Sequence, residues 1–158
     1  MESELGDDFD IFLSYIRTIL VKEKARHNLL KEFEDGIYNP KVFNKSSKQY
    51  ERQPPLMKRG EETFELIKGY HQEHDALFSG SNYSISNNWA FDNLVSVLRD
   101  TALSDIWVPP LLMYKKFFGN TRILDFLTLL DNKFSGYWIA RETPTTRIEA
   151  MAEILKKI

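Results

Sequence analysis

Apolar side chains recur every three or four residues through most of this chain, the spacing that places them on one face of an α-helix. No segment shows the sustained alternation that is typical of a β-strand. The pattern therefore predicts an all-α fold, a single-domain antiparallel helical bundle of six or seven helices. The expected helices span residues 8–24, 29–35, 56–78, 88–103, 109–118, 121–140 and 144–158.

Residues with strong positional preferences mark the ends of two of these helices. Asn28 is a suitable N-cap for the second helix, and Gly36 is placed to end it. Thr146 and Glu149 have the spacing of a capping box, which predicts an N-terminal cap at the start of the last helix.

The apolar pattern also predicts what lies in the core. Residues 121–140 carry apolar side chains round most of the helix, so we expect this helix at the centre of the bundle. Trp89, Trp107 and Trp138 fall within helical apolar patterns, and we expect all three to be buried.

Helical periodicity disappears between residues 37 and 56. Asn39-Pro40, Ser46-Ser47 and Pro54-Pro55 are signals of turns and of helix breaks. We therefore expect one long loop near residues 37–56, with little regular structure. A loop of this length inside a compact domain is usually functional or mobile.

Composition limits the class of protein. At 158 residues, 42% of them hydrophobic, the chain is long enough to form one folded domain over residues 1–158. It contains no cysteine, which excludes disulfides, thiol catalysis and cysteine-based zinc sites. No signal peptide and no apolar run of about 18 residues is present, so we expect a cytoplasmic protein without membrane association.

The three histidines do not form a complete catalytic or metal-binding set. His71 and His74 lie three residues apart on an expected helix, but no facing helix offers the further ligands that a metal needs. His27 follows Lys24 and Arg26 at a helix end, where a cation suits the terminal carbonyls. Glycine-rich phosphate-binding motifs are also absent. We expect no catalytic residue, no metal and no cofactor in this chain.

One stretch is rich in cations, although the net charge of the chain is −2. Between residues 40 and 60 Glu51 is the sole acid, and Phe43 and Tyr50 lie among the cations. Cations with interleaved aromatic rings are typical of segments that contact nucleic acid, whereas the alternative is an ordinary solvated loop. For a DNA contact, the residues expected to neutralise phosphates are Lys45, Lys48, Arg52, Lys58 and Arg59.

Three segments together resemble a known family. They are Trp107-Val108-Pro109-Pro110-Leu111-Leu112-Met113-Tyr114-Lys115-Lys116-Phe117, then Phe134-x-x-Tyr137-Trp138-Ile139-Ala140-Arg141 with Thr143-Pro144-Thr145-Thr146-Arg147-x-Glu149, and Phe12-x-x-Tyr15-Ile16. These segments are similar to the helical region of GmrSD-type proteins, which are modification-dependent restriction endonucleases and related phage-defence proteins.

The resemblance implies a connecting role. In that family a helical region links an N-terminal ParB-like domain, marked by Asp-Gly-Gln-Gln-Arg, to a C-terminal His-Asn-His-type nuclease. This chain has no Asp-Gly-Gln run and no histidine after His74, so neither catalytic signature is present. We expect a non-catalytic scaffold and coupling domain, a fragment of a larger nucleotide-dependent nuclease, whose partners are the flanking domains and DNA.

Two other hypotheses remain. The chain is alternatively a protein–protein interaction or regulatory module whose aromatic-rich surface receives a partner helix. A third hypothesis is an enzyme that uses His71 and His74 as metal ligands. The sequence does not determine the oligomeric state, or the DNA modification and nucleotide recognised by a parent protein.

Overall fold

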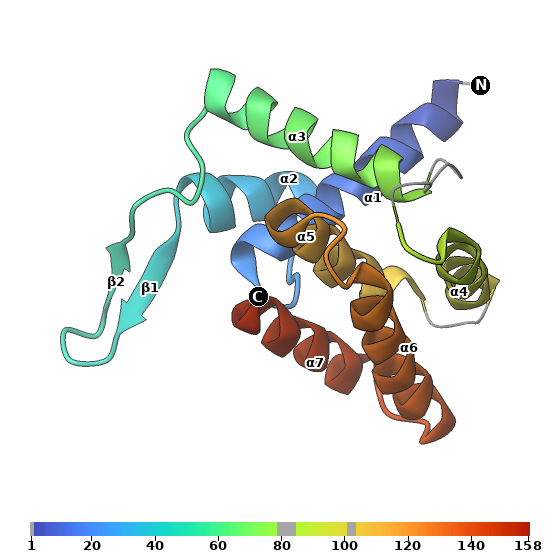
Figure 1. The fold of residues 1–158 in the computed structure, drawn as a ribbon. Coiled ribbons are helices and arrows are strands. Elements are labelled where there is room, and N and C mark those ends of the chain that lie inside the picture. Colours follow the sequence, from blue (N-terminus) through green and yellow to red (C-terminus); the bar gives the residue numbers. More distant parts are fainter. Residues whose placement is uncertain (1, 79–84, 101–103) are drawn as a thin grey trace. The chain divides into compact units, whose positions relative to one another are not determined.

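The computed structural model describes residues 2–78, 85–100 and 104–158. Over these residues the chain forms seven α-helices, one π-helical turn, one short 3-10 helix and two short strands (Figure 1). The expectation of a predominantly α-helical fold is confirmed. None of the helices in these ranges is long and apolar enough to cross a membrane. The chain divides into two compact units, Met1–Lys68 and Gly69–Ile158, which we call the N-terminal unit and the C-terminal unit.

The N-terminal unit begins with helix α1, Glu2–Val21. Phe12, Ile16 and Ile19 from its apolar stripe are buried, as the periodicity predicts. The helix ends three residues earlier than expected because Lys22 adopts a left-handed conformation with φ of 55°, which stops the helical repeat. Helix α2, Leu29–Glu32, follows, and the unit also contains the first turns of helix α3, Glu61–Phe78.

A π-helical turn, Phe33–Tyr38, continues directly from α2. The predicted cap at Asn28 is confirmed, since its side-chain Oδ1 accepts a hydrogen bond from the Lys31 N–H at 3.0 Å. The predicted end at Gly36 is wrong. The turn runs on to Tyr38, because the Asn39 N–H reaches back to the Glu34 carbonyl at 3.0 Å and Ile37 is fully buried.

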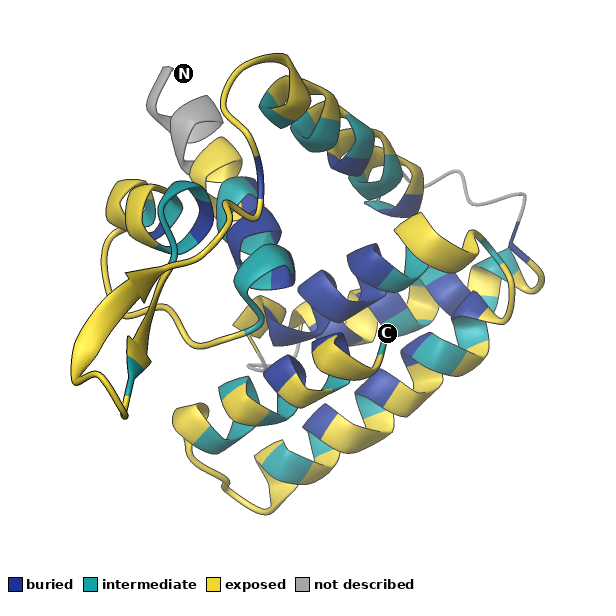
Figure 2. Cartoon of the chain, turned by 90° about the vertical axis from the view of Figure 1, so that its left-hand side faces the viewer, coloured by how far each residue is buried: buried dark blue, intermediate teal, exposed yellow. Residues whose placement is uncertain are grey.

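Residues 41–52 form a β-hairpin where the sequence predicted irregular loop. Strand β1, Lys41–Asn44, pairs antiparallel with strand β2, Gln49–Arg52. Figure 1 shows the hairpin extending away from α1 and α2 of its own unit, and almost all of its residues are exposed (Figure 2). With both faces in solvent, the strands carry no alternation of apolar and polar residues for a sequence pattern to reveal.

The C-terminal unit contains the rest of α3 and four further helices. These are α4 (Asn88–Asp100), α5 (Val108–Phe118), α6 (Ile123–Ile139) and α7 (Pro144–Lys157), with a 3-10 helix, Ser104–Trp107, leading into α5. Residues 101–103, expected at the end of the fourth helix, lie outside the described residues. Helices α5, α6 and α7 agree with their predicted segments to within two residues, whereas α3 begins at Glu61, five residues later than expected.

Helix α5, and not α6, is the most buried helix of this unit. All six residues from Val108 to Met113 are buried, and α5 packs against both α6 and α7. Helix α6 buries one stripe that includes Leu127 and Phe134, but Leu129 is 65% exposed. The prediction that residues 121–140 form the centre is therefore wrong, because packing on one side alone covers only one face of an apolar helix.

Two other expectations for this unit also need correction. Trp107 is fully buried as predicted, whereas Trp89 and Trp138 are 67% and 50% exposed. The cap of α7 is Thr143, whose side-chain Oγ1 accepts a hydrogen bond from the Thr146 N–H at 3.2 Å. Pro144 occupies the first turn, where it has no N–H to satisfy, so the cap falls on the residue before it.

Candidate nucleic-acid interface

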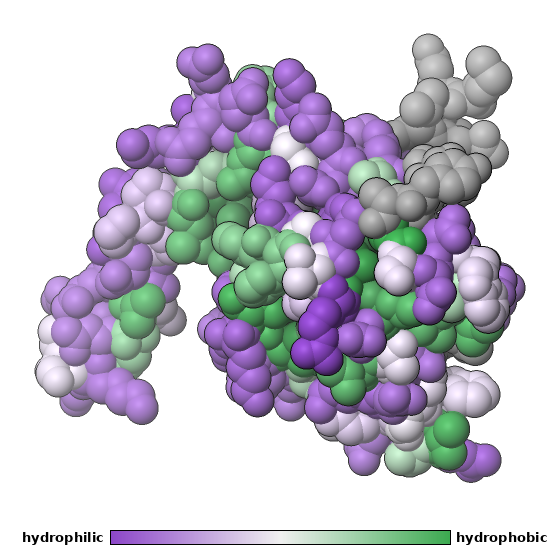
Figure 3. Space-filling view, in the orientation of Figure 1, coloured by the Kyte–Doolittle hydropathy of each residue, from purple (hydrophilic) through white to green (hydrophobic). Residues whose placement is uncertain are grey.

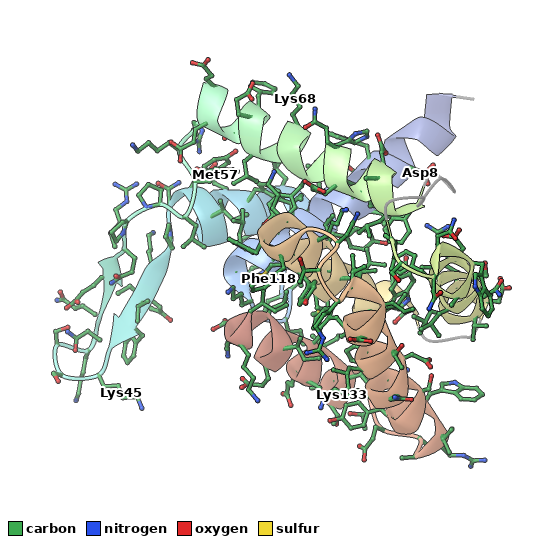
Figure 4. The ribbon with its side chains drawn as sticks, in the orientation of Figure 1. Asp8, Lys45, Met57, Lys68, Phe118 and Lys133 are labelled. Carbon is green, nitrogen blue, oxygen red and sulfur yellow. The ribbon has the colours of Figure 1, made fainter. Side chains whose placement is uncertain are left out.

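The turn of the hairpin is closed by a side chain and not by glycine. Oδ1 of Asn44 accepts hydrogen bonds from the N–H groups of Ser46 at 2.8 Å and Ser47 at 3.3 Å. Lys48 then takes the left-handed conformation, with φ of 55°. Lys45 lies at this turn end of the hairpin (Figure 4). At the opposite end, the Gln53 N–H donates to the Pro40 carbonyl at 2.8 Å and extends the pairing of the strands.

One face of the hairpin combines two aromatic rings with two cations, and we call it the aromatic–cationic face. Lys41 lies opposite Arg52, and Phe43 lies opposite Tyr50. Because side chains alternate along a strand and paired residues share a side, all four lie on one face. The rings of Phe43 and Tyr50 meet edge to face, with centroids 5.2 Å apart, and are 47% and 71% exposed.

The other face of the hairpin is different in chemistry. It carries Val42, Asn44, Gln49 and Glu51, and the Asn44 Nδ2 donates to Glu51 Oε1 at 2.6 Å. Glu51 is thus held on the side away from the two cations. The surface of the hairpin is mostly hydrophilic, with a local apolar spot (Figure 3).

The five cations predicted from the sequence occupy three different places. Arg52 is on the aromatic–cationic face, where its guanidinium donates to Asn39 Oδ1. Lys45 and Lys48 are exposed in the turn. Lys58 and Arg59 lie between β2 and α3, away from the strands. Arg59 forms an ion pair with Glu34, and its guanidinium lies 4.8 Å from the centre of the Tyr38 ring.

A pocket of about 460 Å³ in the N-terminal unit adjoins the hairpin. Lys41 and Tyr50 of the aromatic–cationic face line one side of it. The remaining walls come from the end of α1, the connection over residues 23–27, α2 and the π-helical turn. Lys41 and Tyr50 thus connect the face with the pocket. The sequence places Lys41 in the basic stretch but outside the five expected phosphate contacts.

A buried ion pair forms part of this pocket. Arg17 and Glu32 are 4% and 6% exposed, and a guanidinium nitrogen lies 2.5 Å from Glu32 Oε2. Arg17 also donates to the carbonyl of Glu23, while Glu32 Oε1 accepts from the N–H groups of Arg26 at 2.7 Å and His27 at 2.8 Å. The pair therefore holds the connection between α1 and α2 from both sides. In the sequence, the one sign of this ion pair is the position of Arg17 beside the apolar stripe of the first helix.

The surroundings of Glu32 favour its charged form. Burial by itself raises the pKa of Glu32, but the backbone N–H groups of Arg26 and His27 and the charge of Arg17 together lower it below its ordinary value of 4.5. The Nε–H of Arg17 is a buried donor that has no hydrogen-bond partner among the described residues. Buried donors of this kind are rare in folded proteins, which makes this group notable.

The histidines of α3 contact one carboxylate. Nδ1 of His71 lies 3.1 Å from Asp75 Oδ2, and Nδ1 of His74 lies 4.0 Å from Asp75 Oδ1. Burial lowers the pKa of His74; Asp75 opposes the shift, whereas the charges of His71 and Arg99 add to it. Within residues 2–78, 85–100 and 104–158, no group of three or more metal-ligating side chains is gathered in one place.

Comparison with known proteins gives no relative for this chain. Neither a protein-family model, nor a curated protein, nor a solved structure matches it. The resemblance to GmrSD-type proteins therefore stays a prediction.

Proposed function

We propose that this chain is a non-catalytic helical domain that contacts DNA through its β-hairpin, acting as a scaffold and coupling element in a GmrSD-like restriction nuclease. The helices supply the rigid support, and the hairpin supplies the contact. The proposal rests on one observation, the exposed pair Phe43 and Tyr50 with Lys41 and Arg52 on the same face.

The chemistry of this face suits unpaired bases. Large aromatic rings that stay in water contribute little to folding, but each base that stacks on such a ring contributes about 1–3 kcal/mol to binding. Two cations beside the rings are placed to neutralise phosphates of the same strand. Because stacking needs an accessible base plane, we propose that the hairpin binds single-stranded DNA, or duplex that has been opened, in preference to intact duplex.

Binding of labelled oligonucleotides, followed by fluorescence anisotropy, tests this proposal. The variant Phe43→Ala/Tyr50→Ala should weaken binding of a single strand by roughly 5- to 140-fold per lost stack. The variant Lys41→Gln/Arg52→Gln should reduce the slope of log K against log salt by about 1.4, since each phosphate contact on a single strand contributes about 0.7.

A matched control removes two exposed cations elsewhere. Lys133 and Lys157 lie on α6 and α7 of the C-terminal unit, so Lys133→Gln/Lys157→Gln changes the net charge equally without touching the hairpin. We expect its salt slope to equal that of the unchanged protein. Equal slopes for the hairpin variant and this control would refute the hairpin as the DNA contact.

A second candidate function is docking of a partner helix. An apolar pocket of about 390 Å³ in the N-terminal unit is lined by Leu13, Leu29, Leu30, Phe33 and Ile67, together with Asp10 and Tyr38. Leu30 is 83% exposed there, and such a groove suits the apolar face of an amphipathic helix.

Photo-cross-linking in cells separates the two candidates. A photoreactive residue at position 43 should give a nucleic-acid adduct if the hairpin contacts DNA. The same residue at position 30 should give a discrete protein adduct if the groove receives a partner. A protein adduct at position 30 with no nucleic-acid adduct at position 43 would favour the interaction module.

A further inference from the structure

The pocket beside the hairpin has a buried floor and a cationic rim. Arg17 and Glu32 are almost fully buried, whereas Lys24, Arg26 and Lys31 are exposed at its edge. With Lys41, five cationic side chains line the pocket against three carboxylates, Glu23, Glu32 and Asp35. Glu32 and Arg17 neutralise each other, which leaves four cations against two carboxylates. The remaining charge around the cavity is therefore positive.

Several of these cations are not matched by acids of the protein. In the part of the chain that the structure describes, Arg26, Lys31 and Lys41 form no ion pair. Like charges gathered round one cavity repel each other, and a bound anion would relieve that repulsion. The buried Nε–H of Arg17 is a further donor for which the described residues supply no partner, and an anionic oxygen at the floor would satisfy it.

The position of the pocket indicates which anion it takes. Tyr50 and Lys41 belong both to its wall and to the aromatic–cationic face of the hairpin. A strand whose bases stack on that face thus runs towards the cavity. An internal phosphate has chain on both sides, whereas a strand that ends beside the hairpin presents a terminal phosphate that can enter the pocket without the chain having to continue through it.

We propose that this pocket binds a phosphate monoester, the terminal phosphate of the DNA strand that lies on the hairpin. The inference rests on the proposed function for the source of the phosphate, but the chemistry of the pocket does not. A monoester carries about −1.5 to −2 charges at neutral pH, against one for an internal phosphate, so it gains more from a cluster of cations. A volume of about 460 Å³ accommodates a phosphate together with its sugar.

The experiment compares single strands of one sequence that end in a 5′-phosphate, a 3′-phosphate or hydroxyls alone. Binding is measured by fluorescence anisotropy on the full chain. We expect one of the two phosphorylated strands to bind about ten-fold or more tightly than the hydroxyl strand, the gain of one or two charge-assisted hydrogen bonds. A free deoxynucleoside monophosphate, added as competitor, should remove that gain.

Variants test whether the tighter binding of the phosphorylated strand comes from this pocket. Arg26→Gln and Lys31→Gln should abolish the preference for the phosphorylated end while the hydroxyl strand binds with little change. Lys68→Gln is the matched control, because Lys68 is an exposed cation of the same unit that neither lines the pocket nor belongs to the expected DNA contacts. Far-UV circular dichroism of each variant, unchanged from the parent, shows that folding is intact.

The outcomes separate this inference from the proposed function. Equal affinity for all three strands overturns the terminal-phosphate site and leaves DNA binding by the hairpin in place. A gain that survives Arg26→Gln and Lys31→Gln also overturns it, since the phosphate then binds elsewhere. If no strand binds but the monophosphate protects the pocket lysines from acylation, the proposed function fails and the phosphate site stands with a free nucleotide as its ligand. If neither binds, both are wrong.

Discussion

Replacing Glu32 by alanine perturbs a buried carboxylate of the N-terminal unit that has three partners. The change removes the ion pair with Arg17 and the two hydrogen bonds that Glu32 accepts from the backbone of Arg26 and His27. It leaves the Arg17 guanidinium, 4% exposed, without a counter-charge. Breaking a buried pair in this way costs about 3–5 kcal/mol, because the remaining charge stays desolvated. Since whole domains are stable by about 5–15 kcal/mol, this loss is a large fraction of the total.

The measurement is urea unfolding followed by two signals. Far-UV circular dichroism reports on helices of both units. Tryptophan fluorescence reports on residues 69–158 alone, because Trp89, Trp107 and Trp138 all lie there. We expect Glu32→Ala to move part of the dichroism transition to lower urea. A shift of the midpoint with an unchanged slope would give the change in the free energy of unfolding directly.

Two further variants decide whether the reasoning is correct. Glu34 pairs with Arg59 in an exposed ion pair, so Glu34→Ala should cost less than about 1 kcal/mol. Arg17→Met/Glu32→Leu removes both charges and should be far less harmful than Glu32→Ala alone, since no unpaired buried charge remains. A cost for Glu32→Ala that matches that of Glu34→Ala would refute the argument that burial makes this pair important.

Three other perturbations test separate features. Because the pKa of Glu32 is lowered in the folded chain, its carboxylate stabilises the fold fully above pH 4.5, and this contribution falls as pH drops through the lowered pKa. The difference in urea midpoint between the parent and Glu32→Gln should therefore shrink on acidification below 4.5, and a constant difference would contradict the shift. A Cβ at Gly36 would meet Val21 Cγ2 at 3.6 Å, an ordinary contact, so Gly36→Ala should raise the unfolding free energy by about 0.5–1 kcal/mol in the same titration; a loss would show that the π-helical turn needs glycine. Thr143→Ala should lower stability by about 0.5–2 kcal/mol, read by tryptophan fluorescence, since it removes the N-cap of α7. An unchanged midpoint would mean that the bond to Thr146 contributes nothing.

The helices could be predicted because their cause is local. Side chains three and four residues apart share a helix face, so the stripe of α1 is visible in the sequence before any partner is known. The same holds for the cap at Asn28, which bonds to a residue three positions away. Ends were less predictable where a single backbone conformation decides them, as at Lys22.

The candidate site could be predicted only in part. The cations and rings of residues 41–52 are visible as a composition, but their arrangement depends on which residues pair across the hairpin. The register opposes Phe43 to Tyr50 and turns Glu51 to the other side. A two-residue glycine turn would have marked the hairpin in the sequence. Here Asn44 and a left-handed Lys48 form the turn; asparagine occurs in turns of many kinds, and lysine does not indicate a turn.

The sequence by itself determined the helical class of this protein, most of its helices and the segment where cations and aromatic rings gather. Only the tertiary structure decided that Arg17 meets Glu32, that α5 is buried in place of α6, and that Trp107 is enclosed while Trp89 stays exposed. The physical reason is how far apart along the chain the interacting residues lie. Helix formation follows from neighbours along the chain, whereas burial and ion pairing depend on residues brought together by packing, and many packings are compatible with one apolar stripe.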